Sequence, residues 1–186
     1  MMDTDRYFAA PTFSEYLTAV EKNRDLWHGL WNRASLPPDL ASRAEKLEGR
    51  WHLLALSEDW CGDAVNVLPW VDRMAVAVPS AQLRVLGRDA NPDLMDAHLT
   101  DGRSRSIPVV IIYDEDFEEV GWWGPRPSEL QQWVKQEGLK LPTEERYAEV
   151  RRRYARDRGR SIVEELLALL EAGIPAHAGP DSPPTL

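Results

Sequence analysis

Two compact apolar segments, separated by a segment of helix length, constrain the fold of this 186-residue chain most strongly. The first, WHLLALS, begins at Trp51, and the second, QLRVLGRD, covers residues 82–89. Both predict buried strands, because short continuous apolar runs are typical of strands covered on both faces. The segment from Cys61 to about Val78 predicts a connecting helix, kinked at Pro69. This order predicts two parallel strands joined by a crossover helix.

Further segments add a hairpin and two helices to this unit. The runs IPVVIIYD and FEEVGWW, separated by an acidic turn at residues 114–116, predict a β-hairpin. Asn91 as N-cap and Pro92 at the first helical position predict a short helix before the hairpin. Another helix is expected after GPRP, ending near Gly138. Together they predict an α/β fold with a mixed central sheet of about four strands flanked by helices.

Helical extensions precede and follow the predicted sheet. We expect one helix from the N-cap Ser14 to about Ala34, a short helix to about Glu48, and a helical tail up to about Gly173 with a break at Gly159. The predicted division is an N-terminal helical extension packed on the domain (1–49), a core (50–140), an Arg-rich helical extension (141–174) and a disordered tail (175–186).

The composition, 43% hydrophobic and 28% charged, is typical of a globular chain with one core. The formal net charge of -9 disfavours nucleic acid as the main partner, because phosphate contacts need a basic face. The longest apolar runs are far shorter than the roughly 20 residues of a membrane span. The N-terminus MMDTDRYFAAPTFSEY has no basic region followed by an apolar one. We therefore expect a cytoplasmic protein without a membrane partner.

The Arg-rich segment RRRYARDRGR leaves two interpretations open. It forms either a solvated helix face or a patch for an anion or an acidic partner. In the first case the neutralising acids would be Glu144, Glu145, Glu149, Glu164 and Glu165. The amphipathic segment SIVEELLALLEAG that follows predicts docking either on the domain or on a second copy, which would give a homodimer through the C-terminal helices.

Cys61, the single cysteine, lies where a predicted strand meets the next helix. A helix N-terminus stabilises a thiolate, Gly62 permits a tight turn, and Trp60 shields one side. Asp63 opposes this effect, because its negative charge lies near the sulfur. A reactive thiol and an inert, partly buried cysteine therefore both stay open. One cysteine excludes an internal disulfide, and the four scattered histidines give no metal-ligand spacing, so we expect no metal site.

The segment WCGDA after a hydrophobic strand resembles the active-site motif WCGPC of thioredoxins. Pro69 follows Cys61 by eight residues, as the helix-kinking proline does in that family, and Ile107-Pro108 matches the cis-proline that faces the active cysteine. LGRDANPDLMDAHL, RSIPVVII and GWWGPRP resemble a bacterial thioredoxin-like family with a WCGD signature and a WGPRP turn. The resemblance covers residues 13–138 and implies a thioredoxin-like fold.

Two positions depart from the family pattern. Ala64 stands where the resolving cysteine would be, and Ala55 where the buried acid that assists proton transfer would be. Dithiol exchange needs a second thiol to release the mixed disulfide, so dithiol thioredoxin activity is not expected.

The resemblance leaves three functions open. A monothiol oxidoreductase would use Cys61 on a protein disulfide, or on glutathione or another low-molecular-weight thiol, without a resident cofactor. A catalytically silent binding module would hold a peptide or protein in the cis-proline groove. A redox sensor would form a homodimer linked through Cys61.

The resemblance implies Cys61 as the catalytic residue and seven substrate-binding positions around it. These are Trp60, Gly62, Asp63, Ile107, Pro108, Trp123 and Arg126. For three aromatic and basic positions a structural role is the alternative: Trp122 and Trp123 as core and edge residues, and Arg126 in a salt bridge. Arg88 and Asp89 at a strand end are expected to form a structural ion pair.

Overall fold

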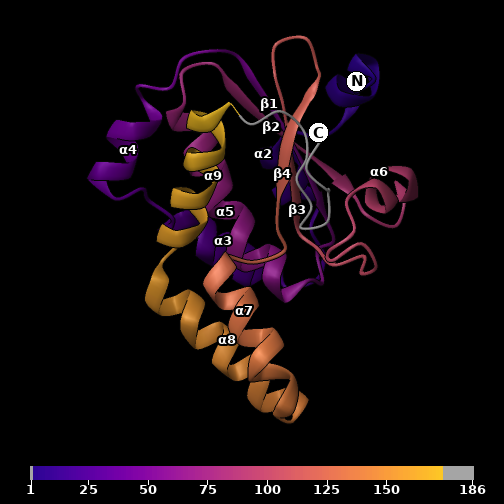
Figure 1. Cartoon of the computed structure of the whole chain (residues 1–186), viewed down its shortest axis with the longest axis vertical. Helices are drawn as coiled ribbons and strands as arrows, with labels where there is room; N and C mark the ends of the chain where they lie inside the picture. The colour runs from indigo at the N-terminus through magenta and orange to yellow at the C-terminus, as the bar shows by residue number, and fades with distance from the viewer. Residues whose placement is uncertain (1, 174–186) are drawn as a thin grey trace, which may run out of the picture.

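A four-stranded sheet in the order β2-β1-β3-β4 forms the centre of the computed structural model, which describes residues 2–173 (Figure 1). Strand β1 (Trp51–Ser57) pairs parallel with β2 (Ala81–Gly87) and antiparallel with β3 (Val109–Tyr113). Strand β3 pairs antiparallel with β4 (Glu119–Trp123). The predicted α/β class and the mixed four-stranded sheet are confirmed.

Helix α5 (Gly62–Ala77) connects the two parallel strands, with Pro69 inside it, as predicted. Three further helices pack on α5: α3 (Arg24–Arg33), α4 (Pro38–Ala44) and α9 (Arg160–Ala172). Figure 1 shows them on the same side of the sheet. Strand β1 is apolar throughout its centre because both of its faces are covered, and six of its seven residues are buried.

The prediction of a single helix from Ser14 to about Ala34 is wrong. Helix α2 (Phe13–Ala19) begins at the N-cap Thr12, and a separate helix, α3, begins at Arg24. The backbone N–H groups of Glu21 and Lys22, which lie between the two helices, donate to the carboxylate of Asp59 at 3.0 and 2.8 Å. These bonds tie the interruption to the loop between β1 and α5. A further helix, α1 (Thr4–Ala9), was not expected.

Two helices flank the β-hairpin as the sequence predicts. Helix α6 (Pro92–Ala97) has Asn91 at its N-cap and Pro92 at its first position. The Asn91 side chain does not cap the helix, however. It donates to the Gly87 carbonyl at 2.7 Å instead. Helix α7 (Ser128–Gln136) follows the Gly-Pro-Arg-Pro turn and leads into a short 3-10 helix, η1 (Gly138–Lys140).

The C-terminal extension forms helix α8 (Thr143–Asp157) and helix α9, with the predicted break at Gly159. Arg158 and Gly159 both have left-handed backbone conformations, with φ of 53° and 75°. Helix α9 buries five aliphatic side chains against its own domain, one of the two predicted modes of docking. They are Ile162, Val163, Leu166, Leu167 and Leu170.

The predicted tail, 175–186, lies outside the described residues. Within residues 2–173, no helix combines the length and the hydropathy needed to cross a membrane.

Candidate functional site

Cys61 is the N-cap residue of α5, and its sulfur faces backbone groups rather than solvent. The Ala64 N–H donates to Sγ at 3.5 Å, and the thiol donates to the Ile107 carbonyl oxygen at 3.4 Å. The residue is 8% exposed. Cys61 therefore joins the start of α5 to the loop that precedes β3.

Burial raises the pKa of the Cys61 thiol, because a thiolate loses solvation inside the protein. The Ala64 N–H lowers this pKa, but the negative charge of Asp63 raises it further, and the net direction is upward. The sequence left the balance between these effects open. In the structure, the burial of Cys61 therefore favours the uncharged form of its thiol.

Asp63, on the first turn of α5, binds two side chains from later in the chain. Arg126 donates through Nε to Asp63 Oδ1 at 2.9 Å and through Nη2 to Oδ2, which gives a bidentate ion pair. The Tyr154 hydroxyl donates to Asp63 Oδ1 at 3.0 Å. Burial raises the pKa of Tyr154 well above its ordinary value, so the hydroxyl keeps its proton and stays a donor.

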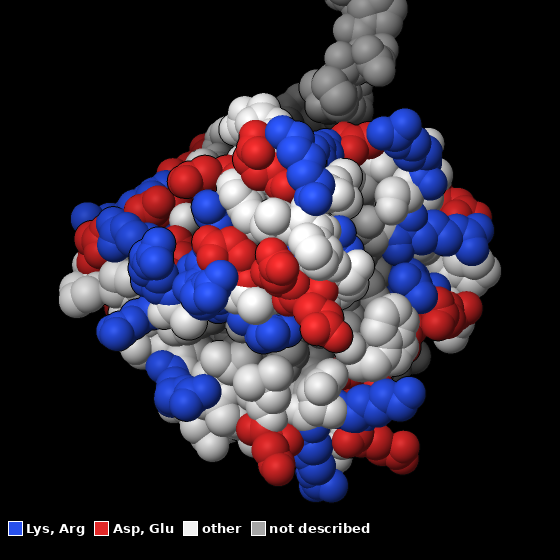
Figure 2. All heavy atoms as spheres, turned by 90° about the horizontal axis from the view of Figure 1, so that it is seen from below, with Lys and Arg blue, Asp and Glu red and all other residues white. Residues whose placement is uncertain are grey.

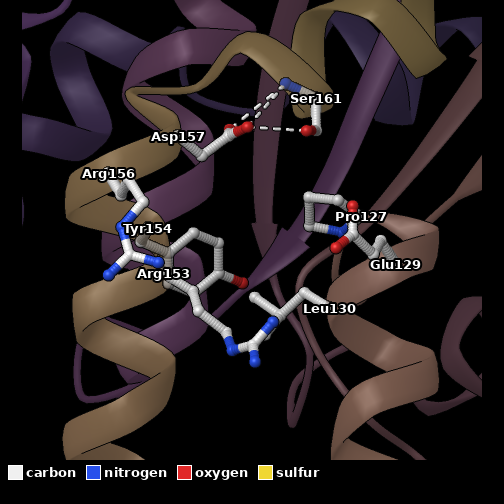
Figure 3. Close-up of a pocket in the computed structure, with 8 residues that line it drawn as sticks. All are labelled: Pro127, Glu129, Leu130, Arg153, Tyr154, Arg156, Asp157 and Ser161. Atoms are coloured by element: carbon white, nitrogen blue, oxygen red, sulfur yellow. Dashed lines mark hydrogen bonds between the residues drawn. The ribbon is translucent and has the colours of Figure 1, made fainter.

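Tyr154 comes from α8 and is only 5% exposed. In Figure 3 its ring extends from α8 toward α7. The family resemblance predicts Asp63 and Arg126 near Cys61. Tyr154 lies in the Arg-rich segment, for which the sequence predicts either a solvated face or a patch for an anion or an acidic partner. In the sequence, Tyr154 stands out only as one aromatic residue among arginines. This pattern does not predict its contact with Asp63, which lies 91 positions earlier.

The cis-proline region lies directly beside this cluster. The Ile107–Pro108 and Gly124–Pro125 peptide bonds are both cis, and Ile107 and Pro108 are buried. Gly124 has a φ of 135°, and a Cβ there would lie 2.2 Å from the Pro108 carbonyl oxygen. Only glycine fits at this position, since the turn after β4 contacts the cis-proline loop closely.

Trp123 does not form an open wall of the site. Its side chain is buried, and its indole N–H donates to Glu165 Oε2 of α9 at 2.6 Å. The other oxygen of Glu165 accepts the Ser128 N–H at 2.8 Å, at the start of α7. Glu165 thus does not neutralise the arginines of α8, contrary to its assignment in the solvated-face interpretation. Through these two hydrogen bonds, Glu165 connects α9 to both ends of the turn that contains Arg126.

Trp60 and Gly62 remain open to solvent at the rim of the site. Trp60 is 45% exposed, and the Arg88 guanidinium lies 5.2 Å from the centre of its ring. Arg88 also donates to the Arg105 carbonyl at 3.2 Å and forms the expected ion pair with Asp89 at 2.8 Å. The Cys61 loop, the end of β2 and the cis-proline loop are therefore connected at this rim.

The charges of α8 do not form a separate basic patch on the face in view in Figure 2. That face, which includes the lower ends of α7 and α8, carries acidic and basic side chains close together. Arg152 and Arg153 both pair with Glu149, at 2.9 and 3.1 Å. Among the described residues, no group of three or more His, Cys, Asp or Glu side chains could hold a metal ion.

The family model of thioredoxin (Thioredoxin_9) matches residues 10–146. The chain belongs to the thioredoxin family. The match ends before Tyr154, so this thioredoxin-family chain carries part of the Asp63 cluster on a segment beyond the family model.

Two crystal structures are similar to this thioredoxin-family chain. One is a protein of unknown function, PA1234, from Pseudomonas aeruginosa, and the other is an HIV epitope-scaffold. Each is 19% identical in sequence, with a TM-score of 0.71, over 92% of this chain and 99% of the other. At this identity the similarity shows the fold alone. No curated protein matches the sequence significantly.

Proposed function

We propose that this thioredoxin-family protein is a binding module that holds an extended segment of a partner protein beside the cis-proline loop. Cys61 then has a structural role. The observation that carries this proposal is the state of the thiol: Cys61 is buried, its pKa is raised, and its proton is donated to the Ile107 carbonyl. With Ala64 in place of a second thiol, the site lacks the resolving group of dithiol exchange, and burial disfavours the thiolate form of Cys61.

The partner surface in this proposal is the rim formed by Trp60 and Arg88. Tryptophan, tyrosine and arginine are enriched among the residues that contribute most to binding energy at protein interfaces. Here the Arg88 guanidinium lies over the exposed Trp60 ring, so the two side chains form one surface. Gly62 keeps the adjacent backbone open, because it has no side chain and is exposed. An extended segment would pass over Gly62 toward the cis-proline loop.

Affinity capture from the source cells with the full-length chain tests this function. Trp60→Ala is expected to lose the captured partner, and Cys61→Ser is expected to keep it. Tyr147→Ala is the matched control, because Tyr147 is an aromatic residue of similar exposure, 48%, on α8. A partner held equally by Trp60→Ala and by the unmodified chain would exclude the proposed rim.

A second candidate function is monothiol exchange with a protein disulfide or with a low-molecular-weight thiol such as glutathione. It is favoured by one observation, the position of Cys61 at the N-cap of α5, where the Ala64 N–H donates to the sulfur. This function requires turnover of a glutathionylated substrate that Cys61→Ser abolishes. Turnover that is unchanged in Cys61→Ser would exclude it.

A further inference from the structure

Helix α8 is held on the site by few apolar contacts. Only Val150 and Tyr154 of its side chains are buried, and it packs mainly on α7 and η1. Arg153 lies over the ring of Trp133 in α7, 4.4 Å from the ring centre. Near the site, the buried Tyr154 ring packs in the core and its hydroxyl donates to Asp63. At the end of α8, the Asp157 carboxylate accepts the backbone N–H and the hydroxyl of Ser161 in α9.

A pocket of about 260 Å³ lies beside Tyr154, between the first turn of α7 and the last turns of α8 (Figure 3). Pro127 and Leu130 line it on the α7 side, and Arg153 and Asp157 line it on the α8 side. The side chains of α7 and α8 that line this pocket do not pack directly against each other there. Tyr154, which is buried beside the pocket, is therefore a main contact between this end of α8 and the site.

The chain also contains a pivot for movement of α8. Arg158 and Gly159 interrupt the helical backbone between α8 and α9. Gly159 lies against the ring of Trp70, so closely that a Cβ there would lie 2.1 Å from Trp70 Cδ2. This contact and the Ser161–Asp157 hydrogen bonds hold the junction between the two helices in place, and α9 is fixed by its five buried aliphatic side chains. A swing of α8 about this junction, away from α7, would leave α9 docked.

We propose that α8 is a releasable cover on the partner-binding site, and that Tyr154 occupies a subsite for a tyrosine side chain of the partner. This proposal rests on the binding function proposed above. The chemistry of the subsite follows from its present occupant, a phenol ring whose hydroxyl donates to Asp63. When α8 swings away, Asp63 keeps its two bonds to Arg126 but loses one donor. A partner tyrosine replaces that donor and fills the vacated space.

Labelling of Cys61 with N-ethylmaleimide in the full-length chain tests the movement. The labelling rate is measured at one fixed pH and at urea concentrations below the unfolding transition. This rate should rise with urea far less steeply than the equilibrium constant of global unfolding does. Tyr154→Phe should speed labelling about ten-fold or more, the size expected for loss of a hydrogen bond to a charged group. Tyr147→Phe, a tyrosine change at an exposed position of the same helix, should leave the rate unchanged.

The proposal fails if Cys61 is labelled only with the urea dependence of global unfolding, or if Tyr154→Phe labels at the rate of the unmodified chain. Hydrogen exchange of the unmodified chain gives a second measurement that needs no variant. The free energy of opening that governs amide exchange should be lower for α8 than for α9. If the amides of both helices exchange only through global unfolding, α8 does not open independently of the rest of the domain.

The subsite is tested with p-cresol, which has the structure of a tyrosine side chain. In Tyr154→Ala, p-cresol should slow Cys61 labelling more than toluene, which has no hydroxyl. Equal effects of the two compounds, or no effect of either, would exclude a tyrosine subsite. These measurements need no partner protein. A partner captured equally by Trp60→Ala and by the unmodified chain would therefore overturn the proposed binding function without affecting these measurements.

Discussion

Helices α8 and α9 are consecutive in sequence but attached to the domain in different ways. Helix α9 buries five aliphatic side chains, whereas α8 buries only Val150 and Tyr154. Full burial of one aliphatic side chain stabilises a protein by about 1.5–3 kcal/mol, so an upper estimate for the five α9 side chains is about 8–15 kcal/mol. Apolar packing makes α9 a permanent part of the fold, while α8 depends on directional polar contacts near the site.

The largest expected effect is that of Leu166→Ala in α9. Leu166 is fully buried, and the substitution should lower the free energy of unfolding by about 2–5 kcal/mol, through lost burial and a residual cavity. Urea denaturation followed by circular dichroism measures the change. A loss as small as that of a surface substitution, about 0.5 kcal/mol, would show that α9 is not the firmly attached helix.

Gly159→Ala should give the next largest effect, because it alters the junction between the two helices. The added Cβ would collide with the Trp70 ring, and the residue would have to keep a φ of 75°. Overpacking and the left-handed conformation together should cost about 2 kcal/mol or more. Thermal denaturation checks this expectation, with Gly173→Ala as the control. Gly173 has a φ of 53° but no atom within 4 Å of an added Cβ.

A smaller effect should appear in the pH dependence of stability. Burial raises the pKa of Cys61, so the unfolded chain releases the thiol proton at a lower pH than the folded chain. The stabilisation that the protonated Cys61 thiol contributes is complete below about pH 8.5, the ordinary pKa of cysteine. It is lost as the pH rises toward the pKa of Cys61 in the folded chain. The free energy of unfolding should fall by up to about 1.4 kcal/mol per pH unit in this range.

Cys61→Ser removes the titrating group and should lack this part of the decline. Serine also suits the position, because its hydroxyl can accept the Ala64 N–H as an N-cap. Urea denaturation at several pH values compares the two chains. Identical pH profiles would mean that the thiol is more solvated than its 8% exposed fraction indicates.

The elements with strong local patterns were predictable from the sequence. A continuous apolar run predicts strand β1, and two such runs around an acidic turn predict the hairpin. Gly62 beside the N-cap Cys61 marks the start of helix α5. Each of these patterns extends over only a few residues. Cys61 and Asp63 could be located in the same way, through the WCGDA segment. Whether the thiol is reactive could not be predicted, because its pKa depends on burial by residues distant in sequence.

Three of the missed features depend on contacts between distant segments. The interruption before α3 is fixed by Asp59, which lies 38 positions after Glu21. The inward orientation of Trp123 depends on Glu165, and the closure of the Asp63 cluster depends on Tyr154. In each case a polar side chain on one element satisfies a group on another, and hydrophobic periodicity carries no information about such pairs.

The two bonds of Glu165 have a consequence for the independence of the family core. A chain that ended at residue 146, where the family match ends, would leave the Trp123 indole N–H and the first N–H of α7 without their shared acceptor. It would also uncover the surface of α5 on which α9 packs. In this protein, α9 of the C-terminal extension therefore completes the hydrogen bonds and the packing of the thioredoxin core. We expect a stable domain to need the extension as well as the segment that the family model matches.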